Sequence, residues 1–207
     1  MYLSRVEIDT KKTKTLQALS SPEILHGIVE SCFSGDKQRN LWRIDTLNGR
    51  LYLLLLSREI PDFTTLMQQI GVPGTQCESR SYEPLLNRIE AGSIWRFRLT
   101  ANPVMSVPDS QGKRGKLRAI TPAASQREWM IRQGKQHGFL VAPGQFDVVR
   151  SEWLKFRNKG RNLSIFCSTF EGILTVTDAD QFREALTDGI GRAKSYGMGL
   201  ITVMSHG

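Results

Sequence analysis

The pattern of hydrophobic and polar positions divides the first half of the chain into short strands and amphipathic helices. Residues 1–9 alternate with β-branched and aromatic side chains and predict a strand. A helix is predicted from Pro22 to about residue 33, because apolar residues recur there every three or four positions. The other predicted elements are strands over residues 41–46 and 50–58, a helix over residues 62–70 and an extended segment over residues 75–89.

Similar elements recur after residues 91 and 92, where an alanine and a glycine separate two patterned regions. Residues 94–107 alternate as a long strand that Pro103 bends, and residues 113–120 predict a second strand. The later predicted elements are helices over residues 125–137 and 181–187 and strands over residues 149–156, 162–170, 173–177 and 199–204, with a basic turn at residues 157–161.

Two tandem α+β units are the simplest account of this order. The first half reads strand, helix, strand, strand, helix, strand, which is typical of a ferredoxin-like or RNA-recognition-like domain. We therefore expect domains over residues 1–91 and 92–207, each an antiparallel sheet covered by helices on one face. Such a sheet leaves its other face open, which is how RNA-recognition modules are built.

Composition favours an acidic partner. The chain has 207 residues, with 28 Lys and Arg against 20 Asp and Glu and a net charge of +8. This excess favours nucleic acid, although many basic proteins bind nothing in particular. The first residues lack the long apolar run of a signal peptide, and the longest apolar run, residues 51–56, is too short to cross a bilayer. We expect a cytoplasmic protein that does not enter membranes.

The sequence indicates no metal or cofactor site. Cys32, Cys77 and Cys167 form no C-x-x-C pair, and no H-E-x-x-H motif is present, so neither a zinc site nor a disulfide framework is suggested. The glycines at 189 and 191 follow a predicted helix and precede a strand, which is the reverse of the dinucleotide-binding fingerprint. We therefore expect no metal ion and no cofactor.

A glycine-rich segment, TDGIGRAKSYGMGLITV at residues 187–203, connects the last predicted helix to the last strand. Glycines let another chain segment approach closely, and successive backbone N–H groups can form an anion-binding concavity. A glycine-rich connection with solvated cations explains the segment alone equally well. The candidate RNA-binding residues here are Gly189, Gly191, Arg192, Lys194, Gly197 and Gly199.

Two other segments concentrate positive charge. WLKFRNKGRN carries cations at alternate positions, which places them on one face if the strands continue to the turn. A solvated hairpin is the commoner case, but four cations without an intervening acid favour RNA phosphates. Trp95 and Phe97 are candidate stacking platforms, although alternating aromatic residues in a strand more often belong to a core. The candidate cations are Lys155, Arg157, Lys159 and Arg161 in the first segment and Lys113, Arg114, Lys116 and Arg118 in the second.

His26 is the leading candidate for catalysis. It lies away from the apolar stripe of its predicted helix, so its imidazole is expected on the exposed side. An imidazole gives or takes a proton near neutral pH, which RNA cleavage needs at the attacking 2′-OH or the leaving 5′-oxygen. Most lone surface histidines have no such role. Glu23, one turn earlier, is a candidate helper that would stabilise the protonated imidazole, although the helix dipole alone also favours a first-turn acid.

Three stretches resemble the CasE family, the CRISPR repeat-processing endoribonucleases of the type I-E Cascade complex. They are MYLSRVEI at the start, WRFRLTANPV at residues 95–104 and FEGILTVTDADQFREALTDGIGRAKSYGMGLITV at residues 170–203, and the similarity spans essentially the whole chain. The resemblance implies two tandem ferredoxin-like domains and metal-independent cleavage at the base of a repeat RNA stem-loop. In that reaction the 2′-OH attacks the adjacent phosphate and leaves a 2′,3′-cyclic phosphate and a 5′-hydroxyl.

The resemblance also implies roles for particular residues and partners. His26 sits where the family has its catalytic histidine, and residues 155–161 fall where the family inserts a hairpin into the RNA major groove. The implied partners are CRISPR repeat RNA, the processed guide RNA and other Cascade subunits. The chain departs from the family at Glu23, where a tyrosine is usual, and at Gly27. Two alternatives therefore stay open: an RNA-binding structural subunit with weak or no cleavage, and a protein-interaction scaffold without RNA.

Overall fold

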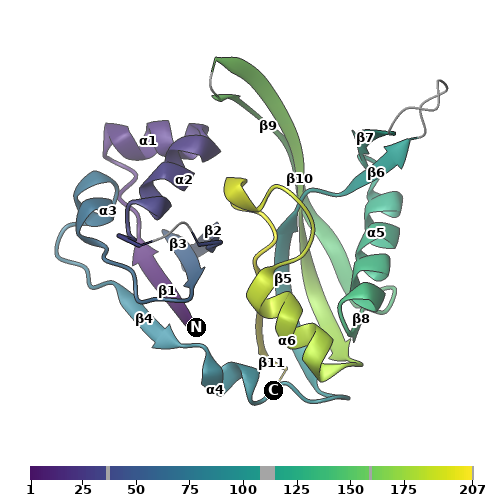
Figure 1. Ribbon diagram of the computed structural model, residues 1–207. Helices are drawn as coiled ribbons and strands as arrows, with labels where there is room; N and C mark the ends of the chain where they lie inside the picture. Colours follow the sequence, from purple (N-terminus) through teal and green to yellow (C-terminus); the bar gives the residue numbers. More distant parts are fainter. Residues whose placement is uncertain (36–37, 108–114, 159, 207) are drawn as a thin grey trace.

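The first half of the molecule is a four-stranded antiparallel sheet with helices on one face (Figure 1). The computed structural model describes residues 1–35, 38–107, 115–158 and 160–206. The strand order is β2-β3-β1-β4, and Val6 and Leu53 of the sheet pack against Leu25 and Leu66 of the helices. The elements are β1 (Tyr2–Glu7), α1 (Thr13–Ser20), α2 (Pro22–Glu30), β2 (Leu41–Leu47), β3 (Arg50–Ser57), α3 (Thr64–Gln69), β4 (Glu78–Ser81) and α4 (Glu83–Leu86).

The second half repeats this connectivity with an insertion. Its main sheet has the order β11-β5-β10-β8, and β9 pairs with β10 beside β8. A separate hairpin, β6 with β7, lies between the first strand and its helix. The elements are β5 (Ile94–Ala101), β6 (Val104–Val107), β7 (Lys116–Ala119), α5 (Ala123–Gln136), β8 (Phe139–Leu140), β9 (Phe146–Asn158), β10 (Arg161–Val176), α6 (Ala179–Asp188), the 3-10 helix η1 (Lys194–Tyr196) and β11 (Ile201–Ser205).

Both halves place their first and third strands at the centre and their fourth and second strands at the edges. This order is that of the ferredoxin-like fold, so the predicted α+β class with two tandem ferredoxin-like units is confirmed. The predicted boundary at residues 91 and 92 lies between α4 and β5 and stays a prediction. Within the described residues, none of the helices is both long and apolar enough to span a membrane.

Several elements differ from the prediction. No helix was predicted between the strand over residues 1–9 and Pro22, but α1 forms there because Thr15 and Ala18 are buried against the neighbouring helix. The predicted strand over residues 94–107 is two strands, and β7 pairs with β6 instead of entering the main sheet. The predicted strands 162–170 and 173–177 are one strand, β10, whose pairing with β9 shifts register between Thr169 and Phe170.

The aromatic residues of β5 belong to the core. Trp95 and Phe97 are 3% and 4% exposed and pack with residues of α5, α6 and β10. The interpretation of these two residues as stacking platforms for bases is therefore wrong. Their alternation with Arg96 and Arg98 instead places the aromatic rings under the helices and the arginines on the open face of the sheet.

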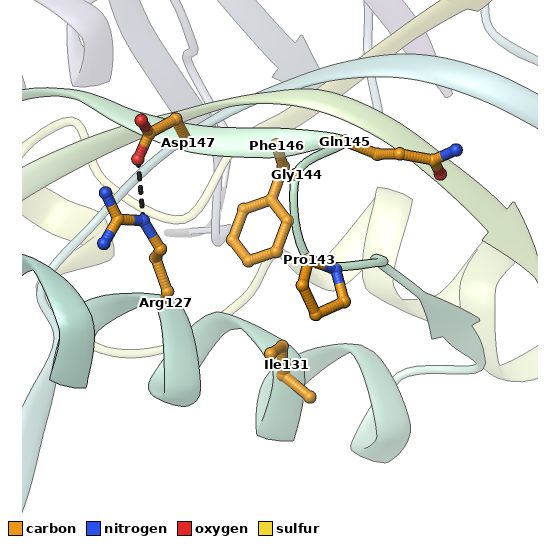
Figure 2. Close-up of a pocket in the computed structure, with 7 residues that line it drawn as sticks. All are labelled: Arg127, Ile131, Pro143, Gly144, Gln145, Phe146 and Asp147. Atoms are coloured by element: carbon orange, nitrogen blue, oxygen red, sulfur yellow. Dashed lines mark hydrogen bonds and ion pairs between the residues drawn. The ribbon is translucent and has the colours of Figure 1, made fainter.

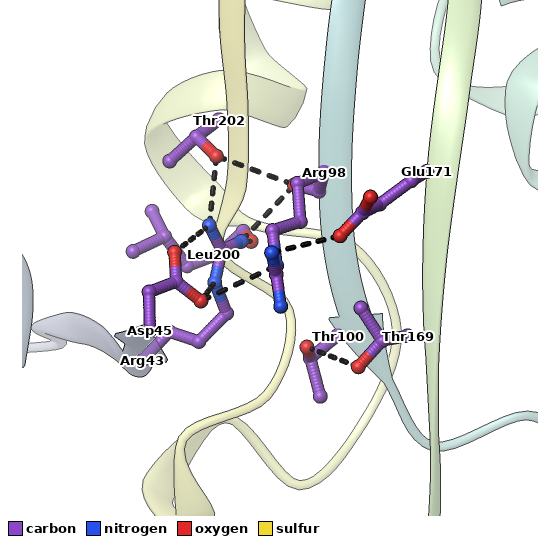
Figure 3. A network of polar contacts seen from close by, with 8 residues as sticks. All are labelled: Arg43, Asp45, Arg98, Thr100, Thr169, Glu171, Leu200 and Thr202. Atoms are coloured by element: carbon purple, nitrogen blue, oxygen red, sulfur yellow. Dashed lines mark hydrogen bonds and ion pairs between the residues drawn. The ribbon is translucent and has the colours of Figure 1, made fainter. Parts of the chain in front are cut away.

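A buried arginine joins the two halves (Figure 3). Arg43 on β2 is 2% exposed, and its Nε and Nη2 donate to the carboxylate of Asp45 over 2.9 and 2.7 Å. Its Nη1 donates to the carbonyl oxygens of Arg98 on β5 and Leu200 beside β11, and its Nη2 also donates to Thr202 Oγ1. All five N–H donors of the guanidinium are therefore used, three of them on the second half.

Replacing Arg43 by methionine should destabilise the protein by about 3–5 kcal/mol, because the Asp45 carboxylate would stay buried without its bidentate partner. The free energy of unfolding from urea titration measures the effect. Arg96→Met removes an exposed arginine from the adjoining strand β5 and should change it by less than about 0.5 kcal/mol. Equal effects of the two variants would contradict the role given to Arg43.

Candidate functional site

His26 lies on α2, which begins with Pro22 at its first turn and buries Leu25, Ile28 and Val29. The imidazole is 38% exposed, and its Nδ1 lies 4.0 Å from a carboxylate oxygen of Glu30 on the next turn. Nδ1 is itself buried and has no hydrogen-bond partner among the described residues. The carboxylate beside His26 is thus that of Glu30, and within the described part of the chain Glu23 makes no ion pair with the imidazole. The i,i+4 spacing of His26 and Glu30 is the sequence signal that would have indicated this pair.

The glycine-rich segment crosses from the second half to the first. Its 3-10 helix η1 packs against α2 and β2. At Gly189 a Cβ would lie 2.8 Å from Leu41, and at Gly197 it would lie 2.5 Å from the Trp42 ring, and both glycines have positive φ. These two glycines therefore permit close contact with β2. Gly199 is tied to the sheet, since its N–H donates to the Thr100 carbonyl oxygen.

The cations of this segment have different surroundings. Arg192 is exposed, whereas Lys194 is partly buried and donates to the Asp188 carbonyl oxygen at the end of α6 over 2.6 Å. Burial lowers the pKa of Lys194, and the positive charge of Arg39 lowers it further. Burial, followed by the charge of Lys194, also lowers the pKa of His137. Arg39 therefore adds a cation beside the glycine-rich segment that was not among the residues predicted from the sequence.

Lys155 and Arg157 lie on one face of the β9–β10 ribbon, opposite Ser164 and Asn162. Arg161 pairs with Asn158, so its side chain lies on the other face. The expectation that Arg161 shares the face of Lys155 and Arg157 is wrong, because β9 ends at residue 158 and β10 begins at residue 161, which reverses the alternation. Lys159 lies outside the described residues.

Trp153 was not identified from the sequence as a candidate. It is 49% exposed, and it shares the face of Lys155 and Arg157 because the three alternate along β9. Its ring lies 5.1 Å from that of Phe166 on β10. The exposed basic face of the ribbon therefore also carries an aromatic surface of the kind on which bases stack.

A second basic surface lies on the β6–β7 hairpin. Lys116 and Arg118 are exposed on β7, and Lys113 and Arg114 lie outside the described residues. This hairpin is joined to the start of α5 and lies on the opposite side of the main sheet from the first half (Figure 1). The candidate cations therefore occupy separate elements of the second half, and a ligand that reaches all of them has to be long.

The surface has a cleft that is lined by residues of the candidate site and a depression that is not. A cleft of about 340 Å³ runs between the first half and the β9–β10 ribbon, and Pro22, Leu25, Leu154, Tyr196 and Gly197 are among the residues that line it. A depression of about 490 Å³ lies between α5 and the start of β9, with the Arg127–Asp147 ion pair at its rim (Figure 2). None of the candidate site residues lines that depression. Among the described residues, no three or more His, Cys, Asp or Glu side chains are grouped to hold a metal ion.

Comparison with known proteins gives one family over nearly the whole chain. Residues 1–204 match the family model described as CRISPR associated protein. The chain is 26% identical to the CRISPR-associated endoribonuclease Cse3 of Thermus thermophilus, over 98% of this chain and 99% of that protein. It is 28% identical to the CRISPR system Cascade subunit CasE of Escherichia coli, over 56% of this chain and 60% of that one.

The structure of Cse3 bound to a 19-nucleotide RNA has the same fold. It superposes with a TM-score of 0.84 at 24% identity and covers 99% of this chain and 100% of that one. The resemblance to CasE noted in the sequence is confirmed by these matches.

The tight approach at Gly197 generates a stability prediction. Gly197→Ala should lower the free energy of unfolding by about 2–4 kcal/mol, because the new methyl group meets the Trp42 ring at positive φ. Gly144→Ala is the matched control: its φ is +82 against +78 at Gly197, but no atom lies within 4 Å of the new Cβ. That variant should lose only about 1 kcal/mol. Urea titrations compare the two, and equal losses would show that the contact with Trp42 contributes nothing.

Proposed function

The chain belongs to the CRISPR-associated protein family, and we propose that it is an endoribonuclease that binds the stem-loop of CRISPR repeat RNA and cleaves at its base. One observation carries the proposal. Helix α2 with His26 packs against η1 of the glycine-rich segment, and η1 contacts the basic β9–β10 ribbon through Tyr196. The helix that carries a candidate proton-transfer group and the ribbon that carries candidate phosphate-binding cations, from distant parts of the sequence, are therefore both joined to η1.

The proposed reaction needs only proton transfer and positioning. The 2′-oxygen of one nucleotide forms a bond to the adjacent phosphorus, and the bond from phosphorus to the 5′-oxygen breaks. One proton leaves the 2′-OH and one reaches the 5′-oxygen, so the products are a 2′,3′-cyclic phosphate and a 5′-hydroxyl. The His26 imidazole moves one of these protons, and the Glu30 carboxylate lies 4.0 Å from its Nδ1.

RNA binding is assigned to the basic elements around α2. The end of the β9–β10 ribbon enters the major groove of the stem, with Lys155, Arg157 and Lys159 on phosphates. Arg161, on the other face of the ribbon, contacts the strand that approaches α2. Lys113, Arg114, Lys116 and Arg118 extend the basic surface along the stem. In the glycine-rich segment, RNA binding is assigned to the partly exposed Gly191 and the exposed Arg192, while Gly189, Gly197, Gly199 and Lys194 hold the segment in place.

The proposed biological setting follows from the named relatives. One is a Cascade subunit, so we infer that this chain keeps the processed guide RNA and joins other Cascade subunits in the cytoplasm. The two units, residues 1–91 and 92–207, then divide the work: the first carries His26 and the second carries the basic ribbon and the glycine-rich segment.

An RNA-binding structural subunit with weak or no cleavage is the second candidate. It is favoured by Glu23, which stands where the family usually has a tyrosine. Incubation of the pure protein with labelled repeat RNA in EDTA separates the two candidates, because only the endoribonuclease gives a discrete product that ends in a cyclic phosphate.

His26→Ala should reduce the single-turnover cleavage rate by at least about 10²-fold, because no other imidazole lies on α2 to transfer the proton. The dissociation constant for RNA should change less than about twofold, since one imidazole contributes little beside several phosphate contacts. His206→Ala, which removes a histidine near the chain end, is the control and should cleave normally. Normal cleavage by His26→Ala would reject the assignment.

Lys155→Ala and Arg157→Ala should each weaken RNA binding. Each should also lower the slope of log Kd against the logarithm of the salt concentration by about one, because each variant loses one phosphate contact. Binding titrations at several salt concentrations give the slope. Arg80→Ala removes an exposed arginine on β4 of the first half and should leave the slope unchanged. A uniform change in all three variants would mean that only total charge matters.

A further inference from the structure

The end of the β9–β10 ribbon projects beyond the main sheet. Pairing between β10 and β5 stops at Ser168, whereas pairing between β10 and β9 continues to Arg161. Over residues 161–167 the ribbon therefore has no third strand among the described elements. Seven residue pairs extend about 23 Å, and a two-stranded ribbon of this kind is marginally stable without packing.

A hollow lies between the projecting ribbon and helix α2 of the first half. The cleft of about 340 Å³ separates them and is lined by Leu154 of the ribbon on one side and by Pro22 and Leu25 of α2 on the other. This stretch of the ribbon is therefore not packed solidly against α2. Figure 1 shows η1 of the glycine-rich segment between the two.

Tyr196 of η1 makes contacts across this gap. Its hydroxyl oxygen accepts a hydrogen bond of 3.0 Å from Nδ2 of Asn158, the last residue of β9. Its ring centroid lies 5.0 Å from that of Phe156, at an interplanar angle of 55°. Both contacts are on the face of the ribbon opposite Lys155 and Arg157, so they leave the basic face free.

The backbone on either side of Tyr196 is held in a fixed conformation. Ala193 and Gly197, on either side of η1, both have left-handed backbone angles, with φ of +62 and +78. A non-glycine residue keeps this conformation only where its surroundings fix it. Gly197 is in turn seated against Trp42 of β2. The phenol is therefore a fixed point joined to the first half, and the ribbon is attached to it.

We propose that Tyr196 is a positioning residue that holds the basic ribbon at a set distance from α2, so that RNA bound by the ribbon presents its scissile phosphate to His26. The inference rests on the proposed endoribonuclease function. Tyr196 transfers no proton in this role. Its effect is on geometry, and a displacement of about 1 Å at a reacting centre can cost up to 10²-fold in rate.

The test compares cleavage with binding in matched variants. Tyr196→Phe removes the hydroxyl but keeps the ring, and Asn158→Ala removes the donor. Each should lower the single-turnover cleavage rate by about three- to tenfold, the loss expected from one hydrogen bond. The Kd for RNA with a 2′-deoxy nucleotide at the cleavage site should change less than about twofold. The double variant should be no slower than the slower single variant, because both lose the same contact.

Tyr52→Phe, which removes a phenol hydroxyl from β3, is the control and should match the parent protein. Hydrogen exchange provides a readout that needs no RNA: amides of residues 152–158 and 161–167 should exchange faster in Tyr196→Phe than in Tyr52→Phe. Parent-like cleavage and exchange in Tyr196→Phe would overturn the inference, as would weaker binding with an unchanged bound-state rate. If the parent protein does not cleave, the proposed function fails, and the exchange comparison alone decides whether Tyr196 holds the ribbon.

Discussion

The relation between the two halves depends on one buried guanidinium. Removing a charge from water is costly, and the cost is offset only when the group's hydrogen bonds are complete. Arg43 meets this condition with acceptors on both halves, since Asp45 lies on its own strand and the other acceptors come from or beside β5 and β11. A sliding movement of one sheet past the other would leave a buried N–H unpaired. Because Arg43 fixes the two sheets relative to each other, it also fixes the position of the glycine-rich segment against α2.

The glycine-rich segment shows how one sequence feature serves two purposes. As a sequence, its glycines suit an anion cradle and a plain connection equally. In the structure, Gly189 and Gly197 let the segment lie on Leu41 and Trp42, so part of the glycine content is needed for joining the halves. Arg192 stays exposed, whereas the Lys194 ammonium is drawn back to the end of α6. The segment therefore works first as a brace and offers RNA a smaller surface than its composition suggests.

The sequence was sufficient for the parts that local periodicity controls. Alternation located β1, short apolar segments on either side of a turn located β2 and β3, and Pro22 with the apolar stripe after it located α2 and His26. Prediction from the sequence failed where a distant contact or the length of a turn determines the structure. Helix α1 depends on packing with α2, and the face on which Arg161 lies depends on where β9 ends. The carboxylate beside His26 is Glu30 because side-chain direction, in addition to spacing, selects between two nearby acids.

The projecting ribbon affects how the free protein interacts with other copies of itself. Over residues 161–167 both strands have an edge without a neighbour among the described strands, and such edges readily pair with another copy of the same chain. Lys155 and Arg157 on β9 and Arg161 on β10 place like charges on both strands. Two copies that approach edge to edge therefore repel each other, whereas a polyanion is attracted. The same cations thus disfavour self-association through this ribbon and attract polyanions to it.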